Sequence, residues 1–233
     1  YNSSQDTFRP STIPVANTEG NPESEPEATA KTAKMYNWLF EQTMTYNKDI
    51  KGHSISALAG WTMQYQRDES TYAFANGFIT NNIPTLNAGT VTRGNTNASE
   101  WALLSGLARV QYNYKGKYML TGALRADGAS RFGKENRWGW FPSVSAGWRL
   151  TEESFMKSLT FIDDLKLRVG YGVTGSQPKD PFLGVAMLKY GSYAFVNGNW
   201  IQTIVPASNP NPDLKWEEKK ETNIGLDFVS WGG

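Results

Sequence analysis

The chain has 233 residues, of which 39% are hydrophobic and 13% aromatic, and it contains one His and no Cys. The lack of thiols excludes disulfide frameworks, thiolate zinc sites and Cys nucleophiles, and a net charge of +1 argues against electrostatic binding of nucleic acid. A mean hydropathy of −0.52, without any long apolar run, excludes a transmembrane helix.

The first 34 residues are polar and interrupted by prolines. Four prolines and four glutamates fall within this stretch: Pro10, Pro14, Pro22 and Pro26, and Glu19, Glu23, Glu25 and Glu27. Such a composition buries too little apolar surface to offset the entropy lost on ordering. The sequence therefore predicts that residues 1–34 form a polar loop or tail.

From Met35 the pattern changes to a period of two, which is typical of strands with one apolar and one polar face. In residues 36–46 the apolar positions are Tyr36, Trp38, Phe40, Met44 and Tyr46. Residues 55–65 repeat the alternation after the short connection 47–52. The two runs together predict a β-hairpin.

Five further strands follow the same alternation along the chain. They are predicted at residues 104–114, 118–127, 140–150, 165–174 and 216–228. The connections are short at 47–52 and 115–117 and long at 67–100, 128–137 and 175–214, with a helical turn expected at residues 152–157. The prediction is an all-β, antiparallel up-and-down meander of about seven long strands.

Two classes of protein fit this meander. Strands of about ten residues, joined by tight turns on one side and long loops on the other, are typical of a transmembrane β-barrel. Aromatic residues near both strand ends favour the barrel, because such side chains gather at the membrane interfaces. The alternative is a soluble carbohydrate-binding β-sandwich, which buries the same apolar face in a core. In the barrel, residues 1–34 are expected on the extracellular side.

Several segments are specific enough to show a family resemblance. They are YMLTGALRADGASRFG (118–133), NRWGWFPSVSAGWR (136–149), DLKLR (164–168), YGVTG (171–175), NPDLKWE (211–217) and TNIGLDF (222–228). In order and spacing they are similar to motifs of the SusC/RagA-type TonB-dependent outer-membrane transporters. The clear resemblance covers about residues 101–230, and residues 36–66 fit it less specifically.

This resemblance implies that the chain is a piece of the wall of a large barrel. Family members carry an N-terminal plug inside the barrel and act with the TonB complex, which would engage a region absent from this chain. The expected location is the outer membrane of a Gram-negative bacterium, in contact with lipid. The expected partner is a SusD-like surface lipoprotein, and the expected ligands are glycans, peptides or other large nutrients. A passive porin-like channel is a weaker alternative.

Charged residues recur on the polar face of successive strands. They are Arg109, Arg125, Arg149, Arg168 and Asp227. In a barrel this face is the lumen, so one hypothesis is that these side chains dock the plug through paired arginine–carboxylate contacts. The alternative is a ladder of ion pairs within the wall, for instance between Arg125 and Asp127.

Aromatic residues in the long loops are candidates for ligand or partner contact, because such contacts concentrate on loops. They are Trp101, Tyr193, Trp200, Tyr72 and Phe74. Their rings are suited to stacking on sugars. The alternative is that they pack the loops against each other.

No feature of the sequence predicts an enzyme, a cofactor or a metal. The acidic pairs Glu152–Glu153 and Asp163–Asp164 lie in a connection, and neighbouring carboxylates do not face one substrate as a glycosidase requires. For that segment, capping of the short helical turn by Thr151 is the expected role.

Overall fold

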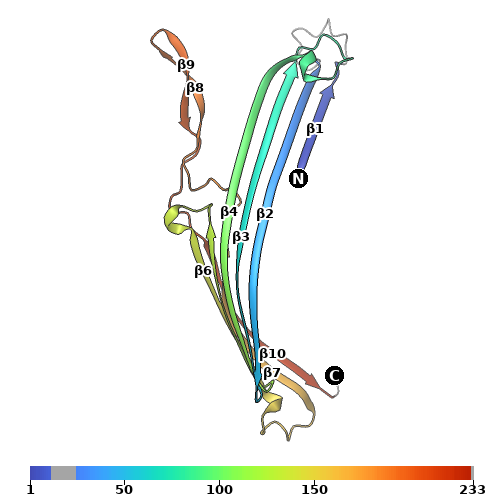
Figure 1. Cartoon of the computed structure of the whole chain (residues 1–233), viewed down its shortest axis with the longest axis vertical. Coiled ribbons are helices and arrows are strands. Elements are labelled where there is room, and N and C mark those ends of the chain that lie inside the picture. The colour runs from blue at the N-terminus through green and yellow to red at the C-terminus, as the bar shows by residue number, and fades with distance from the viewer. Residues whose placement is uncertain (12–24, 232–233) are drawn as a thin grey trace. The chain divides into compact units, whose positions relative to one another are not determined.

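The computed structural model describes residues 1–11 and 25–231. Its strands are β1 (Asn2–Arg9), β2 (Glu27–Ile50), β3 (His53–Asn76), β4 (Thr90–Tyr114), β5 (Tyr118–Ala129), β6 (Trp138–Arg149), β7 (Ile162–Ser176), β8 (Leu188–Val196), β9 (Asn199–Pro206) and β10 (Glu217–Ser230) (Figure 1). Within the described ranges, three single turns of 3₁₀-helix connect them: η2 (Leu86–Ala88), η3 (Lys134–Asn136) and η4 (Leu150–Glu152).

Eight of the strands form one sheet in the order β1-β2-β3-β4-β5-β6-β7-β10, and β8 and β9 form a separate hairpin. The strand pairs with an assigned register are antiparallel. For example, Leu103 of β4 lies opposite Ala129 of β5, and Glu217 of β10 lies opposite Ser176 of β7. The predicted all-β meander is confirmed. None of the helical segments among the described residues is long and apolar enough to cross a membrane.

The tight turns follow from the backbone conformations that the sequence permits. Lys51 and Gly52, between β2 and β3, both have positive φ, at 47° and 84°. Asn197 and Gly198, between β8 and β9, have φ of 50° and 82°. Two-residue turns of this kind match the right-handed twist of the flanking strands. Glycine as the second turn residue avoids the steric cost of a positive φ, because it has no Cβ.

Contacts divide the chain into two units, which are described separately: Tyr1–Trp38 with Tyr65–Trp101, and Leu39–Gln64 with Ala102–Gly233. In the first unit a small core forms around Ala28, Ala75 and Phe78. The ring of Phe8 meets that of Phe78 edge-on at 5.4 Å. This core ties β1 to the residues that follow β3.

In the second unit one face of the sheet is apolar over most of its length and largely exposed. Ala146 on β6 lies between Leu120 on β5 and Val169 on β7 in the strand register. Leu120 is 50% exposed, and Ile224, next to Val169 on β10, is 74% exposed. A soluble β-sandwich buries this face against a second sheet. The sandwich alternative is therefore wrong for this chain.

Residues 1–34 are not simply a loop, and this prediction needs correction. β1 pairs with the start of β2, from Asn2↔Lys34 to Arg9↔Glu27. The strand was missed because all of its side chains except Phe8 are polar, so that backbone pairing and the single contact of Phe8 with the core hold it. Residues 12–24 of the predicted loop lie outside the described residues.

Two of the long predicted loops are also shorter than expected. β3 continues to Asn76 and β4 begins at Thr90, so most of the predicted 67–100 loop is strand. The predicted 175–214 loop contains the β8–β9 hairpin. The 128–137 connection is found between β5 and β6, with η3 in it.

The helical turn predicted at residues 152–157 is only partly found, because the backbone there forms single hydrogen-bonded turns, such as Met156 N–H to the carbonyl oxygen of Glu153, and no helix. A 3₁₀ turn lies at Leu150–Glu152 instead, without a side-chain cap. Thr151, the expected cap, donates its hydroxyl hydrogen to Asp164 Oδ1 at 3.2 Å.

Candidate functional site: the charged inner face and its loops

Opposite the apolar face, the second unit carries four arginines and an aspartate of successive strands. We call this the inner face, defined by Arg109, Arg125, Arg149, Arg168 and Asp227. Strand alternation places these residues together, because side chains two apart on a strand share a face. The register then brings partners on neighbouring strands into reach, as with Asp227 opposite Lys166.

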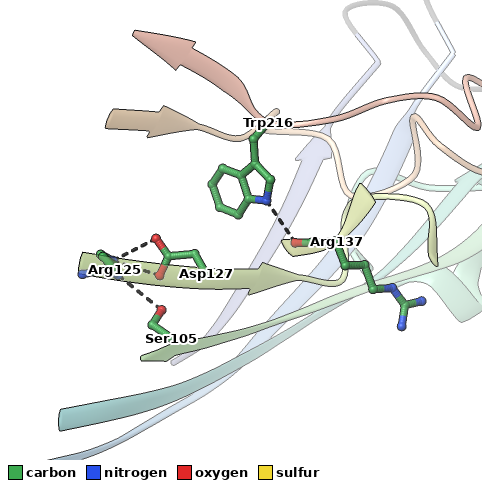
Figure 2. A network of polar contacts seen from close by, with 5 residues as sticks. All are labelled: Ser105, Arg125, Asp127, Arg137 and Trp216. Carbon is green, nitrogen blue, oxygen red and sulfur yellow. Dashed lines mark hydrogen bonds and ion pairs between the residues drawn. The ribbon is translucent and has the colours of Figure 1, made fainter. Parts of the chain in front are cut away.

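Arg125 and Asp127 form the most protected ion pair of the inner face (Figure 2). The Nε of Arg125 donates to both carboxylate oxygens of Asp127 at 2.8 Å, and its Nη2 donates to Ser105 Oγ at 3.3 Å. The side chain of Asp127 is only 10% exposed, and Ser105 is buried. The ladder alternative considered for Arg125 is present in the structure.

Arg168 and Asp227 form a two-pronged pair between β7 and β10. The Nε and Nη2 of Arg168 donate to the two oxygens of Asp227 at 2.8 and 2.7 Å. Gly225 lies opposite Arg168, and a Cβ there would come within 3.2 Å of the guanidinium. The glycine therefore leaves room for the fork of the arginine. Both side chains remain about half exposed.

Arg149 pairs with Asp164, a residue that the sequence analysis placed only in a connection. Arg149 Nε lies 3.2 Å from Asp164 Oδ1. The Nε of Arg149 is buried, and its N–H does not point at the carboxylate closely enough to form a hydrogen bond. Asp164 is the third residue of β7 and lies on its inner face, where the period of two could have revealed it.

Arg109 differs from the other three arginines. It is exposed on β4, and the part of the chain that the structure describes offers it no ion pair. Nearby on the inner face, a depression of about 350 Å³ is lined by Thr121, Ser145 and Gly170 together with Lys166 and Arg168. Glycine and small polar side chains on neighbouring strands create this hollow.

At the long-loop end of the inner face, Trp216 packs among the loop residues, a role that the sequence analysis did not predict for this strand-end aromatic. Its ring lies 4.9 Å from that of Phe132 and 5.3 Å from that of Phe141. Its Nε1 donates to the carbonyl oxygen of Arg137 at 3.0 Å (Figure 2). A Cβ at Gly139 would approach the indole to 2.9 Å, so this glycine permits the close packing.

The loops around Trp216 are joined to each other by the side chain of Arg131. Arg131 donates from Nη1 to the carbonyl oxygens of Pro178 and Lys179 at 2.6 and 3.0 Å. Burial lowers the pKa of the Arg131 guanidinium, and the charge of Asp180 opposes this effect. The connection 130–137 and the start of the 177–216 segment are thus held as one assembly.

The predicted loop aromatics divide into two groups, and the first group is packed. Phe74 is 6% exposed, and the guanidinium of Arg93 lies 4.1 Å from its ring centre. Lys31 Nζ lies 5.7 Å from the ring centre of Tyr72. Trp101 is half-buried. Phe74 in particular offers no free face for a ligand.

The second group lies on the β8–β9 hairpin and is exposed. Tyr193 is 61% and Trp200 is 69% exposed. Phe195 pairs with Trp200 in the register, and their rings are 5.3 Å apart. An irregularity between Tyr190 and Tyr193 shifts the register. Both tyrosines therefore keep to the face that carries Trp200.

At the short-turn end, Glu153 joins three side chains that the sequence analysis did not connect. Its Oε1 accepts hydrogen bonds from Tyr118 Oη at 2.8 Å and Trp148 Nε1 at 2.9 Å, and its Oε2 lies 2.6 Å from Lys117 Nζ. The hydrogen bond from Lys117 is the largest cause that lowers the pKa of Glu153. His53 Nδ1 lies 2.8 Å from Tyr112 Oη at the same end.

The family model described as "TonB dependent receptor-like, beta-barrel" matches residues 1–233. The chain belongs to this TonB-dependent receptor β-barrel family. TonB-dependent receptors P39 and P3 of Formosa agariphila are 39% and 34% identical over 83% and 95% of the chain. TonB-dependent receptor SusC of Bacteroides thetaiotaomicron is 41% identical over 56% of it. The chain spans 19%, 22% and 13% of these relatives, respectively.

Solved structures share the fold of this chain. A chain in the structure of the RagAB peptide transporter matches with a TM-score of 0.85 at 23% identity, over 99% of this chain and 25% of that one. The predicted SusC/RagA resemblance is confirmed, and so is the assignment of the sheet to a TonB-dependent barrel. The relatives are receptors and transporters rather than enzymes.

Proposed function

We propose that this chain is a section of the barrel wall of a TonB-dependent importer in the outer membrane of a Gram-negative bacterium. The observation that carries the proposal is the division of the sheet into an uncovered apolar face and an inner face of paired charges. Only a closed barrel satisfies the backbone of such a sheet in lipid. Its outer face then meets lipid and its inner face meets the wet lumen.

In this proposal the tight turns lie in the periplasm and the longer connections lie outside the cell, as in other outer-membrane barrels. Import would draw on the TonB complex, which acts on parts of the full-length protein other than this wall. A SusD-like lipoprotein would cover the extracellular side. Support for that partner comes from the similarity to SusC and to the RagAB transporter.

The proposed ligand is an oligosaccharide, and the exposed aromatic face of β8–β9 favours it. Tyr193 and Trp200 present open rings, and aromatic rings at binding sites bury large areas with few rotatable bonds. In the full-length protein, Trp200→Ala should weaken oligosaccharide binding several-fold by calorimetry. Trp140→Ala, which removes an exposed aromatic of the outer face, serves as the matched control. Tight binding of peptides but not of oligosaccharides would overturn this ligand class and leave the importer intact.

We also propose that Arg109 contacts a carboxylate of the plug. The other three arginines already have carboxylate partners within the wall, so Arg109 is the one left to bind elsewhere. In planar bilayers, Arg109→Gln in the full-length protein should raise the leak current. Arg168→Gln, which breaks a pair within the wall, should not. Equal currents for wild type and Arg109→Gln would refute the contact.

A further inference from the structure

A groove crosses the outer face of β5, β6 and β7 near the tight turns. Its volume is about 500 Å³ and its surface is almost wholly apolar. Ala146 forms the floor, and its register partners Leu120 and Val169 form the two walls. Towards the turns the walls continue with Tyr118 and Leu167, which flank Trp148 in the register. This volume lies within the range of small-molecule sites, about 300–1,000 Å³.

The walls of the groove are held in place before any ligand arrives. Tyr118 and Trp148 both donate hydrogen bonds to the same oxygen of Glu153, at 2.8 and 2.9 Å. Glu153 is held in turn by Lys117 at 2.6 Å. A ligand that enters the groove therefore meets rings whose orientation is already fixed, which lowers the entropic cost of binding.

Positive charge gathers at the turn end of the groove. Lys117 Nζ lies 5.2 Å from the ring centre of Tyr118, which lines the groove. Lys115 Nζ lies 5.2 Å from the ring centre of Tyr114, which stacks on Tyr118 at 6.4 Å. Glu153 balances Lys117, whereas no carboxylate pairs with Lys115 among residues 1–11 and 25–231. Two lysines against one glutamate leave an excess of positive charge among these three groups.

We propose that the groove binds one anionic glycerophospholipid of the periplasmic leaflet. An acyl chain would lie over Ala146 between Leu120 and Val169, and the phosphate would sit against Lys115 and Lys117. The two features fit one molecule, because the apolar groove runs from the tight turns towards the middle of the strands. Phosphate at the turns and hydrocarbon along the strand match the order of headgroup and chain in a bilayer. An apolar segment of a protein would use the groove without needing the lysines.

The test uses full-length protein in detergent and native mass spectrometry with phosphatidylglycerol or phosphatidylcholine of identical chains. One phosphatidylglycerol should bind per protein, about tenfold more tightly than phosphatidylcholine. Ala146→Leu fills the floor and should lower binding of both lipids at least tenfold. The control is Ala108→Leu, which adds the same volume to the same face of the sheet but on β4, opposite Leu124 and outside the groove. This variant should bind both lipids as the wild type does.

The role of the positive charge is tested with Lys115→Gln. This substitution should remove the preference for phosphatidylglycerol and leave the binding of phosphatidylcholine unchanged. Folding of every variant is checked by heat-modifiable migration, and Val169→Phe fills the groove from its wall if Ala146→Leu does not fold. Wild-type binding in the groove-filling variant would overturn the proposal. Equal losses in Ala146→Leu and Ala108→Leu would also overturn it, because they would indicate general contact with lipid. An unchanged lipid preference in Lys115→Gln would refute the phosphate site.

Discussion

Replacement of Trp216 by Ala should release the segment before β10 from the inner face. The substitution removes two ring pairs, with Phe132 at 4.9 Å and with Phe141 at 5.3 Å, and the hydrogen bond to Arg137 at 3.0 Å. Each ring pair contributes about 0.5–1.5 kcal/mol beyond its burial, and the hydrogen bond contributes about 0.5–1.5 kcal/mol. The expected loss for local opening is therefore about 3 kcal/mol, since the three contributions have similar size.

Hydrogen exchange in the full-length protein measures this loss directly, because local opening sets the exchange rate of protected amides. A loss of about 3 kcal/mol corresponds to roughly a hundredfold faster exchange. That change should appear in peptides covering residues 130–141 and 211–218 and not in those covering β8–β9. Trp216→Phe keeps most of the ring contact and loses the hydrogen bond, so its exchange should rise by less than about tenfold.

Unchanged exchange in Trp216→Ala would show that the indole does not hold this segment. Equal exchange in Trp216→Phe and Trp216→Ala would show that the hydrogen bond alone matters and that the ring packing is incidental. Either result would refute the reasoning from the ring pairs.

Two further predictions concern charged groups. Asp127→Asn should destabilise the barrel by about 1–3 kcal/mol, because it weakens a mostly buried partner of Arg125. The temperature at which heating changes the migration of the barrel in a gel should therefore fall. It should fall less for Asp227→Asn, whose ion pair is about half exposed. Lys117 lowers the pKa of Glu153, so the stabilisation from Glu153 is full above about pH 4.3 and is lost as the pH falls through the lowered pKa. Trp148 fluorescence should report that loss as the pH falls below the ordinary Glu value of about 4.3. Glu153→Gln should abolish this pH dependence, and wild-type acid behaviour of the variant would contradict the role of this carboxylate.

The family and the fold class could be predicted from the sequence because their signals are local. Alternation along residues 140–150 or 165–174 shows which side chains share a face, since the period of a strand is fixed by its backbone. The motifs around Tyr118 and Trp140 gave the family resemblance. The polar strand β1 was missed because its side chains, unlike those of β5 or β6, carry no alternation.

The candidate sites could be predicted only in part. Asp127 was found because it follows Arg125 by two residues on one strand. Asp164 and Glu153 were not found as partners, because their roles depend on which residues of other strands and turns lie beside them. Likewise the burial of Phe74 and the exposure of Trp200 follow from how each segment packs, and both residues look alike as loop aromatics.

The sequence by itself determined that this chain is a β-meander with one apolar and one polar face, and that it resembles the SusC/RagA-type receptors. Both properties depend on the residues within short stretches of the chain. The tertiary structure decided which arginines are already paired, which aromatics are exposed, and that Glu153 holds the rings beside an apolar groove. These depend on strand register, which joins residues far apart in the chain and shifts every contact when it changes.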